Sequence, residues 1–150
     1  MRRVFFSFHY ERDVRRAAVV RNSQRFLDRD EWQFLDGVEW EEVRKTSDLA
    51  IKRWINKELK YTSVTVVLIG AKTSERKWVD YEIQQSLLKN PKNGLLGIRL
   101  DAVKDMNTGT ETSGDLPWRM DGFPVYRWVP GTSETRVGAW LEKAARDAGR

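Results

Sequence analysis

The sequence predicts an α/β fold: a doubly wound parallel sheet with helices on both faces. Apolar runs rich in β-branched residues alternate with segments of helical periodicity along the 150 residues, an order typical of parallel sheets. The run Val64–Ile69 is β-branched almost throughout and ends at Gly70, which predicts an interior strand buried on both faces. Neither a repeat nor a linker is visible, so we expect one domain over residues 1–150.

The other strands are predicted from similar runs. Val4–Phe8 lacks the alternation of a half-exposed strand, Leu95–Leu100 follows a cluster of turn residues, and Val125–Val129 alternates like an edge strand. We also place a short strand around Trp32–Leu35. The residues expected in or beside the core are Phe5, Trp54, Val67, Ile83 and Trp140.

Helical spacing predicts four helices, at Glu11–Phe26, Leu49–Leu59, Glu75–Lys89 and Ser133–Ala144. Ser47 or Asp48 is expected to cap the second helix, and Ser74 the third, because their side chains accept hydrogen bonds from free backbone N–H groups. The segment Ala102–Phe123 is polar and has no periodicity, which predicts a long surface loop.

Composition excludes several kinds of protein. With no cysteine and one histidine, disulfides, a thiolate zinc site and a cysteine nucleophile are ruled out, and no metal site is expected. The apolar run after Met1-Arg2-Arg3 is too short for a signal peptide, and no later run is long enough to span a bilayer. We therefore expect a cytoplasmic protein with no membrane partner.

The net charge of +5 and the sequence pI near 9.6 raise the question of nucleic-acid binding. The 27 basic residues are interspersed with 22 acidic ones, and the one dense basic segment, Arg12–Arg25, also fits the solvated face of a helix. Nucleic acid is therefore an unlikely partner, while an anionic small molecule fits the charge equally well.

Ligands of open parallel sheets bind at the carboxyl ends of the strands. Here those ends are Ser7–Tyr10, Gly70–Thr73 and the residues after Leu100. The chain has neither a phosphate-binding P-loop nor a Gly-x-Gly-x-x-Gly dinucleotide motif. The central strand also lacks the terminal aspartate of a phospho-accepting receiver domain, so these three classes are excluded.

A carboxylate in the helix after the central strand is the remaining candidate. The core stripe of that helix is predicted as Val79, Ile83 and Leu87, with Glu82 beside it and four residues after Trp78. Glu82 is either a solvated glutamate whose stem packs on Trp78 or a functional carboxylate, and spacing alone favours the former.

A family resemblance changes that balance. Val4–Phe8 resembles the opening strand of Toll/interleukin-1 receptor (TIR) domains, and Asp13 with Arg15 resembles the acid and arginine of their first helix. Val66–Gly70 followed by Lys77–Ile83 is similar to their central strand and Trp-x-x-x-Glu helix. Together with Leu95–Ile98, these segments resemble the TIR-like proteins of Thoeris anti-phage defence over most of residues 3 to 101, which implies a flavodoxin-like sheet.

The resemblance implies an enzyme that cleaves NAD, with Glu82 as the catalytic residue. NAD would be the substrate rather than a cofactor, and the ADP-ribose part would be released or cyclised into a nucleotide signal for a downstream effector. A phage-derived trigger and a homo-oligomeric active form are also implied. The chain departs from the family at Arg76, where many TIR domains have serine, and the family's nucleotide-lining loop is placed at Leu35-Asp36-Gly37.

Substrate contacts are assigned to residues at the strand ends and around Glu82. Phe6, Phe8 and Trp78 would stack on a base, although core packing is expected for two of the three. The other candidates are Ser7, His9, Tyr10, Arg15, Asp36, Lys72 and Thr73. Two alternatives to the enzyme stay open: a non-catalytic TIR-like signalling and assembly module, and a basic nucleotide- or nucleic-acid-binding domain. Consumption of NAD would separate the enzyme from both.

Overall fold

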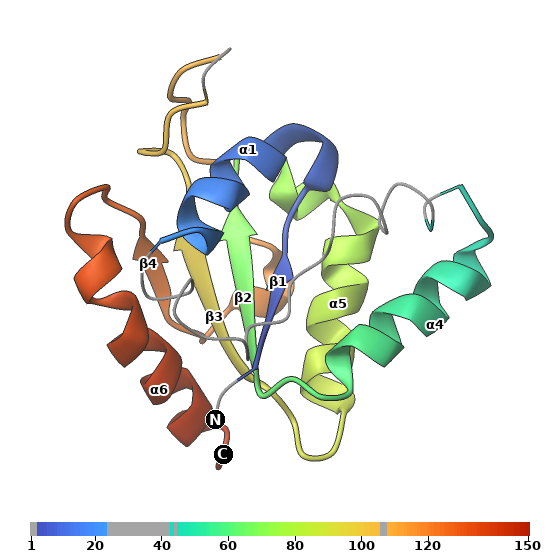
Figure 1. Cartoon of the computed structure of the whole chain (residues 1–150). Coiled ribbons are helices and arrows are strands. Elements are labelled where there is room, and N and C mark those ends of the chain that lie inside the picture. Colours follow the sequence, from blue (N-terminus) through green and yellow to red (C-terminus); the bar gives the residue numbers. More distant parts are fainter. Residues whose placement is uncertain (1–2, 24–42, 44, 106–107) are drawn as a thin grey trace.

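The described strands form one parallel sheet (Figure 1). The structure is a computed structural model that describes residues 3–23, 43, 45–105 and 108–150. The strands lie in the order β1 (Val4–Ser7), β2 (Val64–Ile69), β3 (Gly94–Arg99) and β4 (Val125–Arg127). In register, Val4 pairs with Val64, Val64 with Gly94, and Gly97 with Val125. The order places the carboxyl ends of all four strands at one edge of the sheet.

Helices cover both faces of the sheet (Figure 1). On one face, α1 (Tyr10–Arg21) and α6 (Val137–Asp147) pack on the even-numbered side chains of β1 to β3. On the other face, α5 (Lys77–Leu88) packs on β2 and β3, and α4 (Asp48–Leu59) packs beside α5 over Phe5. Three 3₁₀ turns lie at Thr73–Glu75, Trp118–Met120 and Ser133–Thr135.

The predicted fold class and the main elements are confirmed. β2 has the predicted bounds, is buried at every position and lies between β1 and β3, and β4 is an edge strand. Phe5, Val67 and Ile83 are buried, and Trp54 and Trp140 are partly buried beside the core. Ser47 caps α4 by accepting a hydrogen bond from the Ala50 N–H at 3.2 Å.

Several predicted boundaries were wrong. Ser74 does not cap a helix; it lies in the 3₁₀ turn, and α5 begins two residues later than predicted, at Lys77. The chain turns there because the Thr73 hydroxyl accepts a hydrogen bond from the Gly70 N–H at 2.7 Å. At the other end of the predicted first helix, α1 ends at Arg21 with Asn22 as its C-cap. The predicted strand at Trp32–Leu35 lies outside the described residues.

The segment from 102 to 123 is less exposed than a polar loop was expected to be. Val103 and Met120 are each 1% exposed and belong to the two apolar clusters on opposite faces of the sheet. Arg99 also holds the segment, since its guanidinium donates to the Gly114 carbonyl at 3.0 Å and to Ser113 Oγ.

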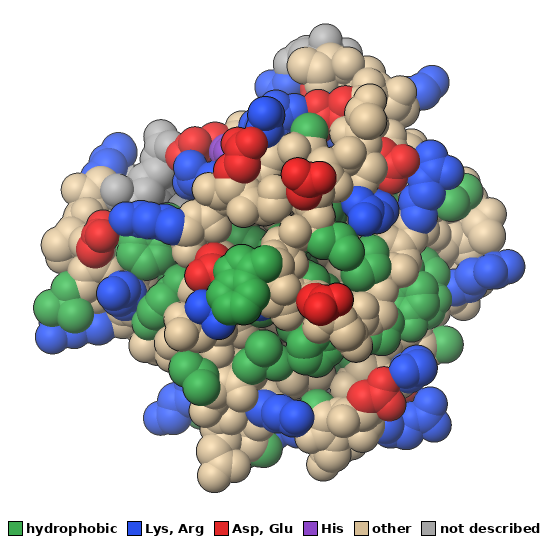
Figure 2. Space-filling model, turned by 180° about the vertical axis from the view of Figure 1, so that it is seen from behind, with side chains coloured by type: hydrophobic (Ala, Val, Ile, Leu, Met, Phe, Trp, Pro, Cys, Tyr) green, Lys and Arg blue, Asp and Glu red, His purple; other side chains and the backbone are tan. Residues whose placement is uncertain are grey.

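Surface properties agree with the interspersed charges of the sequence. On the face seen in Figure 2, basic and acidic side chains are interleaved with exposed apolar ones. Across the described ranges, no helix has both the length and the apolar character that crossing a membrane requires.

Candidate active site

Glu82 lies on the buried side of α5 rather than at its edge. The inward-facing residues of this helix are Val79, Glu82, Ile83 and Ser86, and the Glu82 side chain is only 3% exposed. The predicted stripe is confirmed at Val79 and Ile83, and Leu87 is partly buried against the same cluster. Since Glu82 and Ser86 lie three and seven residues after Val79, half of the stripe that faces the sheet is polar.

Burial dominates the electrostatics of Glu82. It raises the pKa of the carboxyl well above its usual value, while the Ser7 hydroxyl and the positive charge of Arg76 act in the opposite direction. Ser7 is the last residue of β1 and is fully buried. Among the described residues, neither Ser7 Oγ nor Glu82 Oε2 has a hydrogen-bond partner of good geometry. Buried polar atoms are nearly always satisfied, so this pair is an unusual polar feature at the carboxyl edge of the sheet.

Charged and polar residues surround the Ser7–Glu82 pair. Arg76, the residue before α5, lies 3.7 Å from the Glu11 carboxylate. His9 caps α1, and its Nδ1 accepts a hydrogen bond from the Arg12 backbone N–H at 3.3 Å. Burial lowers the pKa of His9, and the Arg76 charge adds to this effect, so a neutral imidazole with an unprotonated Nδ1 is favoured. Of the predicted strand-end residues, His9 is thus brought close to Arg76, and Ser7 to Glu82.

The aromatic candidates separate between the two faces of the sheet. Phe6 is 1% exposed and packs in the cluster under α1 and α6, which leaves no face of its ring for a base to stack on. Phe8 packs against the same cluster and lies 5.9 Å from the Tyr10 ring. Trp78 is half-buried on the Glu82 face, with its ring edge-on to Tyr81 at 5.8 Å. Trp78 is therefore the best placed of the predicted stacking residues.

Four weaker candidates have other partners or cannot be placed. Arg15 is exposed and lies 3.7 Å from Asp105, and Lys72 is exposed and lies 3.5 Å from Glu75. Thr73 is fully buried and shapes the turn after β2 through its bond to Gly70. Asp36 lies outside the described residues.

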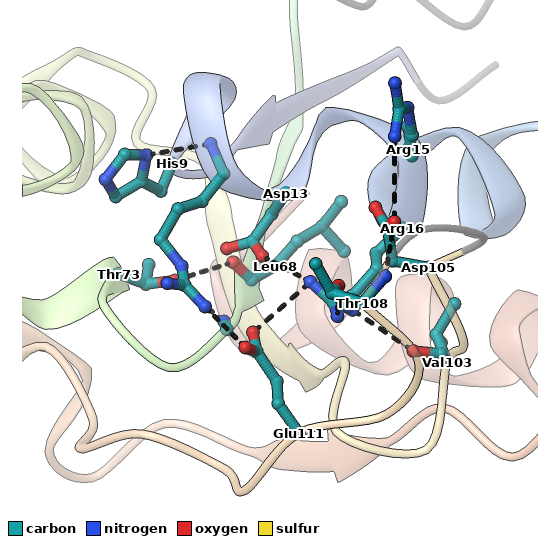
Figure 3. Close-up of polar contacts among 12 residues, drawn as sticks. His9, Asp13, Arg15, Arg16, Leu68, Thr73, Val103, Asp105, Thr108 and Glu111 are labelled. Atoms are coloured by element: carbon teal, nitrogen blue, oxygen red, sulfur yellow. Dashed lines mark hydrogen bonds and ion pairs between the residues drawn. The ribbon is translucent and has the colours of Figure 1, made fainter.

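A second polar cluster at the same edge was not predicted (Figure 3). Arg16 is 2% exposed; its guanidinium contacts Asp13 at 3.4 Å and Glu111 at 3.3 Å. It also donates to the carbonyls of Val103 and Gly109. The arginine that pairs with Asp13 is therefore Arg16 and not Arg15.

Asp13 in this cluster is tightly enclosed. Burial raises the pKa of Asp13, with the Glu111 charge acting in the same direction. A Cβ atom at Gly70 would lie 2.2 Å from Asp13 Oδ2, so only glycine fits at the end of β2. The cluster thus holds residues 103–105 and 108–111 against α1 and the carboxyl end of β2.

The sheet order, the Glu82 helix and the strand ends define a TIR-like α/β domain, and comparison with known proteins identifies its family. The family model for the Thoeris protein ThsB, TIR-like domain, matches residues 5–105. This chain therefore belongs to the ThsB TIR-like family. It is 40% identical over 144 residues, covering 89% of this chain and 74% of the relative, to a Bacillus cereus (strain MSX-D12) protein named "Putative cyclic ADP-D-ribose synthase ThsB1".

Proposed function

We propose that this chain cleaves the bond between nicotinamide and ribose in NAD and closes the ADP-ribose part into a cyclic nucleotide signal. The name of the Bacillus cereus relative supports the substrate and the product class. The observation that carries the assignment of the site is the buried carboxyl of Glu82 beside the buried hydroxyl of Ser7, at the edge where parallel sheets bind ligands.

The chemistry asks for charge stabilisation more than for acid or base catalysis. Nicotinamide leaves as a neutral ring and takes the electron pair of the C–N bond, so positive charge develops on the ribose. A carboxylate held close to that ribose stabilises the charge, and the effect is strong where water is excluded. Glu82 is assigned this role, and Ser7 is placed to contact a ribose hydroxyl or Glu82 itself.

Burial of Glu82 bears on both ionisation and product choice. The raised pKa favours the protonated acid in the closed site, whereas the cationic nicotinamide ring of bound NAD favours the carboxylate. Substrate binding is therefore expected to release a proton. In a dry site, a nucleophile within the ADP-ribose captures the anomeric carbon and closes a ring; capture by water would give linear ADP-ribose instead.

Substrate must reach a side chain that is 3% exposed, so entry requires the residues over Glu82 to move. We assign that opening to activation by a phage-derived trigger and to self-association of the chain. The nucleotide product then acts on a separate effector.

The test is to follow NAD with the purified protein, alone and with lysate from phage-infected cells, and to resolve the products by mass spectrometry. The proposal predicts loss of NAD and a product with the mass of ADP-ribose less one water. If linear ADP-ribose is the only product, NAD cleavage stands but the proposed ring closure is wrong. NAD that stays intact under triggering conditions would favour the non-catalytic assembly module.

A further inference from the structure

A chain of polar side chains runs through the interface between α5 and the sheet. Thr62, Thr65, Ser86 and Asn93 are at most 1% exposed, and they lie among apolar residues. Thr65 Oγ1 and Ser86 Oγ are 2.7 Å apart, and Asn93 Nδ2 donates to Thr65 Oγ1 at 3.0 Å. The chain therefore joins the amino-terminal part of β2 to the inner side of α5 and to the residue before β3.

Lys89 fixes the orientation of the Asn93 amide in this chain. Its ammonium, which can only donate, donates to Asn93 Oδ1 at 2.8 Å and to the carbonyls of Leu59 and Thr62 at 2.9 and 2.6 Å. Asn93 therefore presents its amide N–H to Thr65. Lys89 is partly buried; burial lowers its pKa to about 8, with the charge of Arg150 acting in the same direction.

The far end of the chain is the backbone of Glu82. Ser86 Oγ donates to the Glu82 carbonyl at 2.7 Å, so the hydroxyl proton of Thr65 is the one shared with Ser86. Each side chain thus donates to the next, from Lys89 to Asn93, Thr65 and Ser86, and the last bond reaches the backbone of α5 at Glu82. A connected network with all of its donors used fixes geometry more firmly than isolated bonds do.

The carboxyl of Glu82 depends on this backbone anchor. Glu82 Oε2 has no hydrogen-bond partner among the described residues, and Arg76, which acts on it electrostatically, is paired with Glu11. The Ser7 hydroxyl acts on the same carboxyl by hydrogen bonding. The place of the carboxyl is therefore set by Ser7 on β1 and by where the turn of α5 that carries Glu82 lies on the sheet.

We propose that Lys89, Asn93, Thr65 and Ser86 are positioning residues, whose hydrogen-bonded chain fixes the turn of α5 that places Glu82 at the reacting ribose. This inference rests on the proposed function, because it assigns the residues that hold the carboxylate in place. A displacement of about 1 Å in a catalytic group can lower a rate on the order of a hundredfold, so loss of one link is expected to act on the chemical step.

The test is to break the chain at its centre. Thr65→Val keeps the shape of the side chain and removes the hydroxyl, so that Ser86 loses its donor. We expect kcat for NAD cleavage to fall on the order of tenfold or more with KM little changed, since contacts with the rest of NAD are untouched. Thr65→Ser, which restores the hydroxyl, should recover most of the activity. Ser86→Ala breaks the same link from the helix side and replaces Thr65→Val if that variant does not fold.

Ser133→Ala is the matched control. Its hydroxyl is also buried, accepts from the Val129 N–H at 2.7 Å and lies near α6, away from Glu82. Equal losses of kcat in Thr65→Val and Ser133→Ala would show a general stability effect and overturn the positioning role. If Glu82→Gln is inactive while Thr65→Val keeps the parental kcat, the positioning inference alone fails. If Glu82→Gln is active, the proposed site itself fails.

Discussion

Replacing Glu82 by glutamine is expected to stabilise the protein at neutral pH. The unfolded chain has a glutamate pKa near the reference value of 4.5, and burial places the folded value well above it. Between these two values the folded state holds more protons than the unfolded state, so the free energy of unfolding falls as pH rises. Below the unfolded pKa, the carboxyl is protonated in both states and this loss is absent. Glutamine does not ionise, so the variant does not lose this unfolding free energy at any pH.

The size of the effect follows from the difference between the two pKa values. Each pH unit between them corresponds to about 1.4 kcal/mol of unfolding free energy. In a protein of 150 residues, this amounts to about 3–6 °C in Tm. The raised pKa of Asp13 gives a pH dependence of the same sign, but it is present in both proteins and cancels in the comparison.

The assay is thermal unfolding followed by circular dichroism from pH 4 to pH 8, on the parent and Glu82→Gln. The difference in Tm between the two proteins at pH 4 measures the pH-independent effect of replacing the carboxyl by an amide. The change in that difference from pH 4 to pH 7 measures the effect of the Glu82 charge. Glu75→Gln is the control, since Glu75 is exposed and pairs with exposed Lys72 at 3.5 Å. A Tm difference that does not change with pH would refute the reasoning.

Three further outcomes are expected. Arg16→Leu leaves the buried Asp13 without its cationic partner and removes one of the partners of Glu111, so it should lower the unfolding free energy by about 3–5 kcal/mol and speed hydrogen exchange in residues 103–105 and 108–111. Unchanged exchange there would contradict this. Gly70→Ala brings a Cβ against Asp13 and should cost about 1–3 kcal/mol by chemical denaturation, and less in an Asp13→Ala background; equal costs in both backgrounds would exclude the clash. A carbocyclic NAD analogue, which lacks the cleavable glycosidic bond, should release a proton when it binds the parent but not when it binds Glu82→Gln. Calorimetry in two buffers of different ionisation enthalpy measures this release. No difference between the two proteins would count against Glu82 facing the cationic ring.

The sequence predicted best the elements whose signals are local. β2 was predicted to the residue because its β-branched run is bounded on both sides, and Ser47 was among the two predicted caps because the helical spacing begins directly after it. Ser74 had the same local signal and was wrong. The hydroxyl of Thr73, one residue earlier, closes a turn with the N–H of Gly70 and delays the start of α5.

The site was predicted less completely because its polar residues look like surface residues in the sequence. Glu82 fits the spacing of a solvated helix face, and only its partners across the interface make it buried. Arg16 could not be distinguished from its neighbouring arginines, since the carbonyls of Val103 and Gly109 that it binds lie about ninety residues away along the chain. The family resemblance singled out Glu82 as the candidate catalytic residue, and the hydrogen-bonded chain beneath it became visible only in the structure.

The most direct test of the account is NAD cleavage by Glu82→Gln beside Glu75→Gln and the parent, with lysate from phage-infected cells as the trigger. Removing a preorganised charge from a dry site is expected to lower kcat on the order of a hundredfold or more. We expect Glu82→Gln to remain folded and to lose the cyclic product, while Glu75→Gln makes it at the parental rate. A folded Glu82→Gln that makes the product at the parental rate would contradict the account.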